Sequence, residues 1–191
     1  MALAVGSSAP DFKTTDQDGN EIKLSDFKGK KVVLYFYPKD MTPGCTAEAC
    51  SLRDNYKALK KAGYEVMGIS SDDEKSHRKF IEKEKLPFRL LADVDKSVHA
   101  KFGTWVEKSM YGRKYMGTAR VTFIIDEHGK IQEVIEKVDT KNHAAQILGG
   151  LHAPAKSADK SEKKSPAKKT VKIIARKAVK RVKTKITKKK K

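Results

Sequence analysis

The sequence predicts a three-layer α/β sandwich, with helices on both faces of one sheet, and three features lead to this prediction. Residues 32–37 form a continuous apolar run, as expected of a strand that is covered on both faces. Helical patterns alternate with further apolar strand patterns at 66–70 and 88–91. The series closes on a hairpin and a last helix, which fits a sheet enclosed between two helical layers.

Turn, cap and breaker residues place the other elements. Asp18-Gly19 is a turn signal, Pro87 separates a helix from the next strand, and Gly103 ends a helix. An extended hairpin is expected over 7–26, and a second hairpin pairs 121–125 with 131–138. Helices are expected from Cys45 to Leu59, from a Ser71 cap to about Lys85, over 94–102, and from Asn142 to about Leu151. Between the third and the fourth helix, a polar loop contains Trp105, Tyr111 and Tyr115.

Both cysteines of the chain lie in one segment that follows the 32–37 run. Thr42 suits an N-cap and Pro43 the first helical position, which places Cys45 in the first turn of a helix. Free backbone N–H groups and the helix dipole stabilise an anion there, and the thiolate is the nucleophilic form of cysteine. Cys50 follows five residues later, and on an ideal helix the two Cα atoms are more than about 8 Å apart. A disulfide tolerates at most about 7 Å, so a bond between them requires the first turns to unwind.

Other interpretations of the two cysteines stay open at this point. Free cysteine often serves only as a small buried hydrophobe. A zinc site has less support, because no second pair of cysteines or histidines lies at ligand spacing. The five histidines are scattered, so surface or structural roles are expected for them, and Lys39 and Asp40 are expected in a solvated turn. The strand, the cap and the proline before Cys45 favour a redox role.

Two segments resemble those of a known family. Residues 35–46 resemble the peroxidatic motif of peroxiredoxins, Pro-x-x-x-Thr-x-x-Cys, and residues 117–126 resemble the arginine-bearing strand of the same family. The spacing of the cysteines is similar to that of the bacterioferritin-comigratory, or Q-type, subfamily. The resemblance extends from about Ser8 to Leu148. It implies a thioredoxin-like fold and a thiol peroxidase that reduces hydrogen peroxide or organic hydroperoxides.

The resemblance also implies how the two cysteines share the reaction. Cys45 is the peroxidatic nucleophile, and its attack on a peroxide produces a sulfenic acid. Cys50 is the resolving cysteine, which condenses with the sulfenic acid to a disulfide that thioredoxin or a similar dithiol then reduces. No metal, haem or flavin cofactor is implied. A resolving cysteine within the chain removes one need for a dimer, so we expect a monomer.

Four further residues complete the site that the resemblance implies. Thr42 hydrogen-bonds the peroxide and the thiolate, and Arg120 holds the thiolate charged. Pro38 shields the sulfur from bulk water, and Glu48 orients the arginines. These roles agree with the chemistry, because cleaving an O–O bond requires a deprotonated sulfur and donors aimed at the oxygens where charge develops.

The charge of the chain is concentrated at its C-terminal end. Residues 152–191 hold 17 Lys and Arg against 2 Asp and Glu, a net +15 of the chain's formal +18. We therefore expect a thioredoxin-like peroxiredoxin domain over 1–151 and a lysine-rich tail over 152–191. The tail divides into a linker over 152–166 and a basic amphipathic segment over 167–191. An isolated polycation repels itself, so we expect the tail to be disordered or conditionally helical, folding only beside a polyanion.

Nucleic acid is the first expected partner of the tail, through release of counterions. The tail has no aromatic anchor for a bilayer, which places a membrane surface second and an inert solubilising or targeting extension third. A protein of another class, a nucleic-acid-binding or architectural protein on an inactive thioredoxin-like scaffold, is the alternative to an enzyme. The residues expected to contact nucleic acid are Lys168, Lys169, Lys172, Arg176, Lys177, Lys180 and Arg181.

The sequence also bears on the compartment. No apolar run is long enough to span a membrane, and the N-terminus lacks the pattern of a signal peptide. Two cysteines without an export signal fit a reducing compartment, where thiols are kept for chemistry. We expect a cytoplasmic protein that the tail associates with the nucleoid, or a nuclear protein if the host cell has a nucleus.

Overall fold

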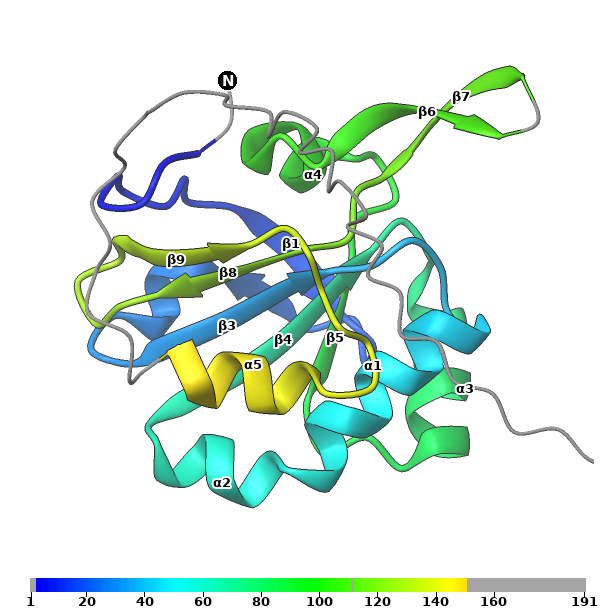
Figure 1. Ribbon diagram of the computed structural model, residues 1–191. Coiled ribbons are helices and arrows are strands. Elements are labelled where there is room, and N and C mark those ends of the chain that lie inside the picture. Colours follow the sequence, from blue (N-terminus) through cyan, green and yellow to red (C-terminus); the bar gives the residue numbers. More distant parts are fainter. Residues whose placement is uncertain (1–2, 111, 151–191) are drawn as a thin grey trace, which may run out of the picture. The chain divides into compact units, whose positions relative to one another are not determined.

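The computed structural model describes residues 3–110 and 112–150, and a mixed sheet of seven strands forms its middle layer (Figure 1). The strands are β1 (Lys13–Asp16), β2 (Glu21–Lys23), β3 (Lys31–Phe36), β4 (Tyr64–Ser70), β5 (Arg89–Ala92), β8 (Val121–Ile125) and β9 (Ile131–Ile135). Their order is β2-β1-β5-β4-β3-β8-β9, so β3 lies inside the sheet, parallel to β4 and antiparallel to β8.

Helices cover both faces of this sheet. They are η1 (Leu24–Phe27), α1 (Pro43–Asp54), α2 (Tyr56–Lys61), α3 (Glu74–Glu84), α4 (Ser97–Phe102) and α5 (His143–Gly150). Buried side chains of α1, α2, α3 and α5 share one core cluster with the sheet, and those of η1 and α4 share a second cluster. The prediction of a three-layer α/β sandwich is therefore confirmed.

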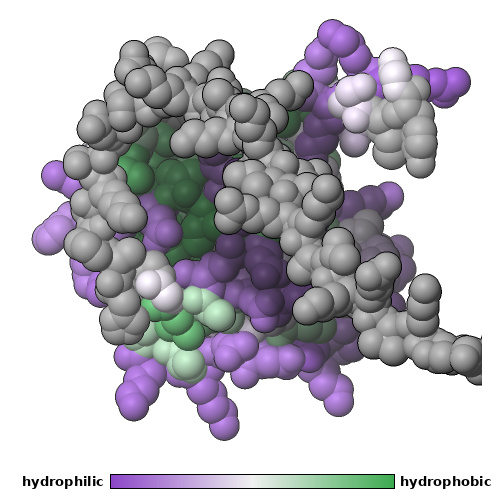
Figure 2. Space-filling view, viewed as in Figure 1, coloured by the Kyte–Doolittle hydropathy of each residue, from purple (hydrophilic) through white to green (hydrophobic). Residues whose placement is uncertain are grey.

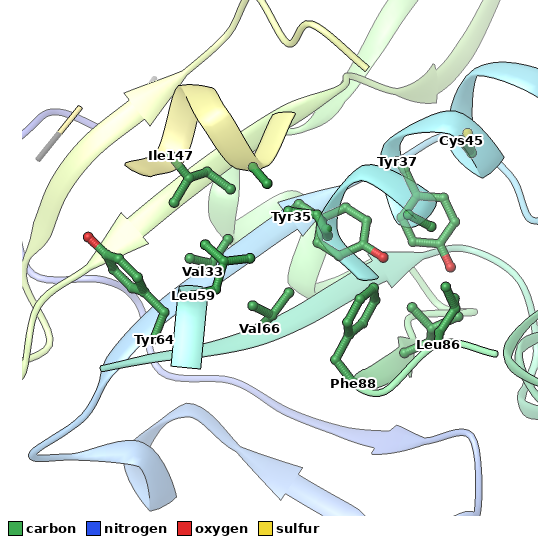
Figure 3. Close-up of a cluster of buried hydrophobic side chains, with 14 of the residues drawn as sticks. Val33, Tyr35, Tyr37, Cys45, Leu59, Tyr64, Val66, Leu86, Phe88 and Ile147 are labelled. Atoms are coloured by element: carbon green, nitrogen blue, oxygen red, sulfur yellow. The ribbon is translucent and has the colours of Figure 1, made fainter. Parts of the chain in front are cut away.

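The apolar run of β3 is buried on both of its sides, as the sequence predicts. Val33 and Tyr35 point into the first cluster, together with Ile147 of α5 (Figure 3). Leu34 and Phe36 belong to the second cluster. Because successive side chains of a strand point to opposite faces, one strand anchors both cores. The loop that leads to Cys45 therefore starts from a strand whose last five residues are all buried.

Most of the other expected elements are found close to their expected ranges. The β1–β2 hairpin, β4, β5 and the β8–β9 hairpin each overlap the predicted strands. Gly103 follows α4 in a left-handed conformation with φ 67°, as the prediction of a helix end at glycine requires. The last helix begins at His143, next to its expected start, and its expected end at Leu151 lies outside the described residues.

Two helical predictions need correction. The pattern that starts at Cys45 is two helices, because α1 ends at Asp54 and the amide of Asn55 donates to the Ser51 carbonyl at 2.9 Å. An asparagine side chain that binds the backbone in this way competes with the helical ladder. The N-cap of α3 is Asp73 and not Ser71, since the Asp73 carboxylate accepts the backbone N–H of Ser76 at 2.8 Å.

The segment predicted as a polar loop is a β-hairpin instead. It consists of β6 (Trp105–Met110) and β7 (Arg113–Thr118), which pair antiparallel and project from the domain (Figure 1). The many charged residues hide the strand pattern, because both faces of a projecting hairpin can meet water. Trp105 packs edge-to-face on His99 and Tyr115 is 45% exposed, whereas Tyr111 lies outside the described residues.

In the view of Figure 2 the described part is hydrophilic along its edges, with hydrophobic areas where α5 and the strands above it lie. None of the helices in 3–110 and 112–150 is long and apolar enough to cross a membrane. The expected linker, the basic segment and all seven tail residues expected to contact nucleic acid lie outside the described residues.

Candidate active site

The structure places Cys45 in the first turn of α1, as the sequence predicts. Thr42 is the N-cap residue, and its carbonyl accepts the backbone N–H of Thr46 at 2.8 Å. The Thr42 hydroxyl does not cap the helix but donates to the Lys39 carbonyl at 3.1 Å. Cys45 is 1% exposed. Pro38, two residues after the end of β3, is half-buried. Cys45 therefore lies at a helix start and is shielded from bulk water.

Arg120 is the cation that meets the Cys45 sulfur. It lies between β7 and β8, and its Nη2 donates to Cys45 Sγ at 3.2 Å. Its Nη1 donates to the carboxylate of Glu48, which stands one turn after Cys45 on α1. The structure thus brings Cys45, Arg120 and Glu48 together across 75 residues of sequence, with one guanidinium bridging sulfur and carboxylate. A charge-assisted donor at this distance stabilises a thiolate.

Glu48 is completely buried behind this pair. Burial raises the pKa of Glu48 to about 7, although the charge and hydrogen bond of Arg120 act in the opposite direction. Its Oε2 accepts from Arg120, but its Oε1 has no hydrogen-bond partner. The carboxyl group therefore changes its charge near neutral pH, immediately beside the arginine that contacts Cys45.

His143 is a neighbour of this site that the sequence interpretation missed. Its Nε2 lies 3.8 Å from Glu48 Oε1 and 2.9 Å from the hydroxyl of Thr122. Burial lowers the pKa of His143 to about 4, with a hydrogen bond to Gln146 opposing it, so the ring is neutral at physiological pH and forms no ion pair with Glu48. No local pattern distinguishes this histidine, because its partners come from α1 and β8, far away in the sequence.

We expect the His143→Gln variant to lose less stability in acid than the unmodified chain. In the unfolded chain, His143 takes up a proton below about pH 6.5. In the folded chain it does so only below about pH 4. The free energy of unfolding therefore falls as the pH drops from about 6.5 to about 4. The loss from this one group is about 2.5 kcal/mol at pH 4.5. Urea unfolding at pH 7 and pH 4.5 measures it. His128→Gln, at an exposed turn histidine, is the control, and equal acid losses in both variants would contradict the assignment.

Asp40, predicted in a solvated turn, is instead buried, at 4% exposure. Its carboxylate accepts from the hydroxyls of Tyr37 and Ser76, each at 2.7 Å, and lies 2.9 Å from His77 Nδ1. Burial alone raises the pKa of Asp40, but the hydrogen bonds from His77, Tyr37 and Ser76 outweigh it and hold that pKa below its usual value. His77 is itself fully buried, and its Nε2 lies 3.1 Å from the Leu91 carbonyl. The loop before Cys45 is thus fastened to α3 and β5.

Cys50 stands on α1 beyond Cys45, and both thiols are free in this wound form of the helix. Cys50 is partly buried, and its Sγ lies 3.6 Å from Oε2 of Glu84, at the end of α3. Among the described residues, no group of three or more His, Cys, Asp or Glu side chains is arranged to hold a metal ion.

Comparison with known proteins agrees with this geometry. The model of the AhpC/TSA family matches residues 5–134. Peroxiredoxin Bcp of Escherichia coli is 50% identical over 149 residues, which cover 78% of this chain and 96% of that protein. Peroxiredoxin Bcp of Bacillus subtilis is 44% identical over 151 residues, or 79% of this chain and 96% of that protein.

Two solved structures are similar over the same region. Peroxiredoxin Q of Xanthomonas campestris is 34% identical with a TM-score of 0.72, and the match covers 78% of this chain and 94% of that one. The bacterioferritin comigratory protein of Xanthomonas campestris is 33% identical with a TM-score of 0.72, and the match covers 78% of this chain and 95% of that one. That structure was determined in a study of its alkyl peroxide reduction activity. The alternative of an inactive scaffold finds no support in these relatives. The chain therefore belongs to the AhpC/TSA family and is a peroxiredoxin of the Bcp, or Q, type, a thiol peroxidase with a thioredoxin-like fold.

Proposed function

We propose that this peroxidase reduces hydrogen peroxide and organic hydroperoxides through Cys45 and recycles through an internal Cys45–Cys50 disulfide. The observation that supports it best is the 3.2 Å contact between Arg120 Nη2 and Cys45 Sγ, with the buried Glu48 carboxylate behind the guanidinium. This arrangement holds a cation against the one sulfur that lies at the start of α1. The alkyl peroxide reduction of the Xanthomonas campestris relative supports organic hydroperoxides as substrates.

The reaction balances with these groups alone. The Cys45 thiolate attacks one peroxide oxygen, the O–O bond breaks, and the other oxygen leaves as water or an alcohol after it takes up a proton. Arg120 and the backbone N–H groups at the start of α1 are the donors for the negative charge that develops on the oxygens. The Thr42 hydroxyl joins them once it turns from the Lys39 carbonyl, and Pro38 limits the access of water.

The second half of the cycle restores the sulfur. Cys50 attacks the sulfur of the Cys45 sulfenic acid, the S–O bond breaks, and water leaves as the S–S bond forms. Since α1 is continuous from Pro43 to Asp54, this step requires its first turns to unwind. Thioredoxin or a similar dithiol then reduces the disulfide, and because both cysteines lie in one chain, we propose that a monomer completes the cycle.

Intact mass after one equivalent of peroxide tests the internal disulfide. The expected product is a monomer that has lost two hydrogens. A stable gain of one oxygen, or a disulfide-linked dimer, would contradict the Cys45–Cys50 pairing. Reduction of the product by thioredoxin, with glutathione as the comparison, then identifies the reductant.

We propose a second function for the tail, the binding of nucleic acid, which places the enzyme at the nucleoid. The charge distribution favours it, because 15 of the 18 net positive charges lie in residues 152–191. Such a density of lysines and arginines binds a polyanion by counterion release, without reading a sequence. The seven basic residues named above, from Lys168 to Arg181, are the proposed contacts.

Removal of residues 153–191 is expected to abolish DNA binding and to leave peroxide reduction unchanged. The tail carries most of the positive charge, whereas the Cys45–Arg120–Glu48 arrangement lies wholly within the remaining residues. Salt-titrated DNA binding of the full and shortened chains measures the first effect, and peroxide consumption measures the second. Equal affinities, or an affinity that does not fall with added salt, would contradict the proposal.

A further inference from the structure

Cys50, the resolving cysteine of the function proposed above, contacts the end of α3. Its Sγ donates to Oε2 of Glu84, the last residue of α3, at 3.6 Å. Burial raises the pKa of Cys50, the charge of Arg53 opposes this, and the Glu84 carboxylate adds to the rise. The thiol in the wound helix is therefore protonated, the less reactive form of a cysteine.

A second contact joins the same two elements. Arg53 stands three residues after Cys50 on α1, and its Nη1 donates to the backbone carbonyl of Glu84 at 2.6 Å. Glu84 thus binds α1 twice, with its side chain at Cys50 and with its backbone at Arg53. Backbone carbonyls at the end of a helix lack partners within that helix, so Arg53 satisfies a group that would otherwise need water. Any unwinding of α1 that displaces Cys50 must break the contact with the Glu84 carboxylate.

We propose that Glu84 is a positioning residue for disulfide formation, which holds the Cys50 thiol on wound α1 and thereby sets the rate at which Cys50 reaches oxidised Cys45. In the step that it controls, the Cys50 sulfur bonds to the Cys45 sulfur as the S–O bond of the sulfenic acid breaks. The departing hydroxyl leaves as water with the proton that Cys50 gives up. While Glu84 holds Cys50, the sulfenic acid of Cys45 persists and can react with a second peroxide molecule.

The Glu84→Ala variant tests this inference. We expect disulfide formation to accelerate about two- to tenfold, the factor that corresponds to one lost hydrogen bond of ordinary net strength. The first oxidation of Cys45 is expected to stay unchanged, because the hydrogen bonds of Glu84 reach neither Cys45 nor Arg120. Stopped-flow fluorescence and timed acid quenching, followed by intact mass, separate the two steps. At excess peroxide, the variant is expected to accumulate less sulfinic acid.

A measurement of the charge of Cys50 distinguishes this role from a purely structural one. In a Cys45→Ser background, the alkylation rate of Cys50 against pH gives the pKa of its thiol, and Glu84→Ala is expected to lower that pKa. Glu84→Gln preserves the size of the side chain and an oxygen acceptor, so it covers the case in which the alanine variant folds poorly. It is expected to shift both readouts in the same direction but less. Glu82→Ala, at an exposed position of the same helix, is the matched control.

The outcomes are separable. A rate of disulfide formation that is unchanged in Glu84→Ala, as in Glu82→Ala, overturns the inference while the proposed function stands. A slower rate overturns it as well, because Glu84 would then act as a base and not as a restraint. Failure of the unmodified chain to lose two hydrogens on oxidation contradicts the Cys45–Cys50 pairing itself, and the inference with it.

Discussion

Cys45→Ser is expected to consume no peroxide above the uncatalysed rate, whereas Cys50→Ser is expected to reduce one equivalent and then to stall. Serine places a far less acidic hydroxyl where Arg120 meets the sulfur at 3.2 Å, so no anionic nucleophile forms at neutral pH. Cys50→Ser leaves that contact intact but removes the sulfur that is proposed to close the disulfide. A peroxide assay with thioredoxin and its reductase measures turnover, and a single-turnover experiment measures the first oxidation.

Each of the two variants is the control for the other, because each replaces one sulfur atom of the same helix with oxygen. Both chains should show the unfolding transition of the unmodified protein within about 1 kcal/mol. Full turnover in Cys45→Ser would exclude Cys45 as the nucleophile. Full turnover in Cys50→Ser would show that another thiol, in solution or on a second chain, completes the cycle.

Arg120→Met is expected to lower the rate of Cys45 oxidation about 10²- to 10³-fold, the usual cost of losing one well-placed donor to a developing charge. The substitution removes the donor at 3.2 Å from Cys45 and also leaves the buried Glu48 without its cation. Arg120→Lys keeps the positive charge but cannot contact Cys45 and Glu48 with two separate nitrogens, so we expect an intermediate rate. Rapid-mixing kinetics with hydrogen peroxide measures all three chains.

Arg113→Met provides the control for this effect. Arg113 is an exposed arginine on β7, seven residues before Arg120, and its loss changes the net charge of the chain by the same amount. We expect the Arg113 variant to oxidise at the unmodified rate. Equal losses in both variants would show that the overall field of the domain, and not the contact at the sulfur, determines the reaction.

The sequence predicted the parts of the molecule whose signals are local. The buried β3 is a continuous apolar run, and the start of α1 combines Thr42, Pro43 and an apolar helical spacing, so both could be recognised from neighbouring residues alone. The resemblance to peroxiredoxins added Arg120 and Glu48, which lie 72 residues apart and which no local pattern joins. The structure brings these two together beside Cys45, in agreement with that expectation.

The parts that were missed depend on contacts between distant segments. Asp40 was expected, with Lys39, in a solvated turn, yet its carboxylate is bonded to Ser76 and His77 from α3. Nothing in the sequence indicates which of the five histidines would be buried. The β6–β7 hairpin was overlooked because its charged residues obscure the alternation that identifies a strand with one buried face.

The buried Asp40–His77 contact has a consequence for what happens when the enzyme is reduced again. It fastens the loop before Cys45 to α3 and β5, whereas the proposed disulfide requires only the first turns of α1 to unwind. We therefore expect the loop before Cys45 to keep its shape throughout the proposed cycle. After reduction of the disulfide, only the first turns of α1 need to form again. An isolated helix forms in about a microsecond. We therefore expect the encounter with the reductant, and not refolding, to limit the rate of return to the reduced enzyme.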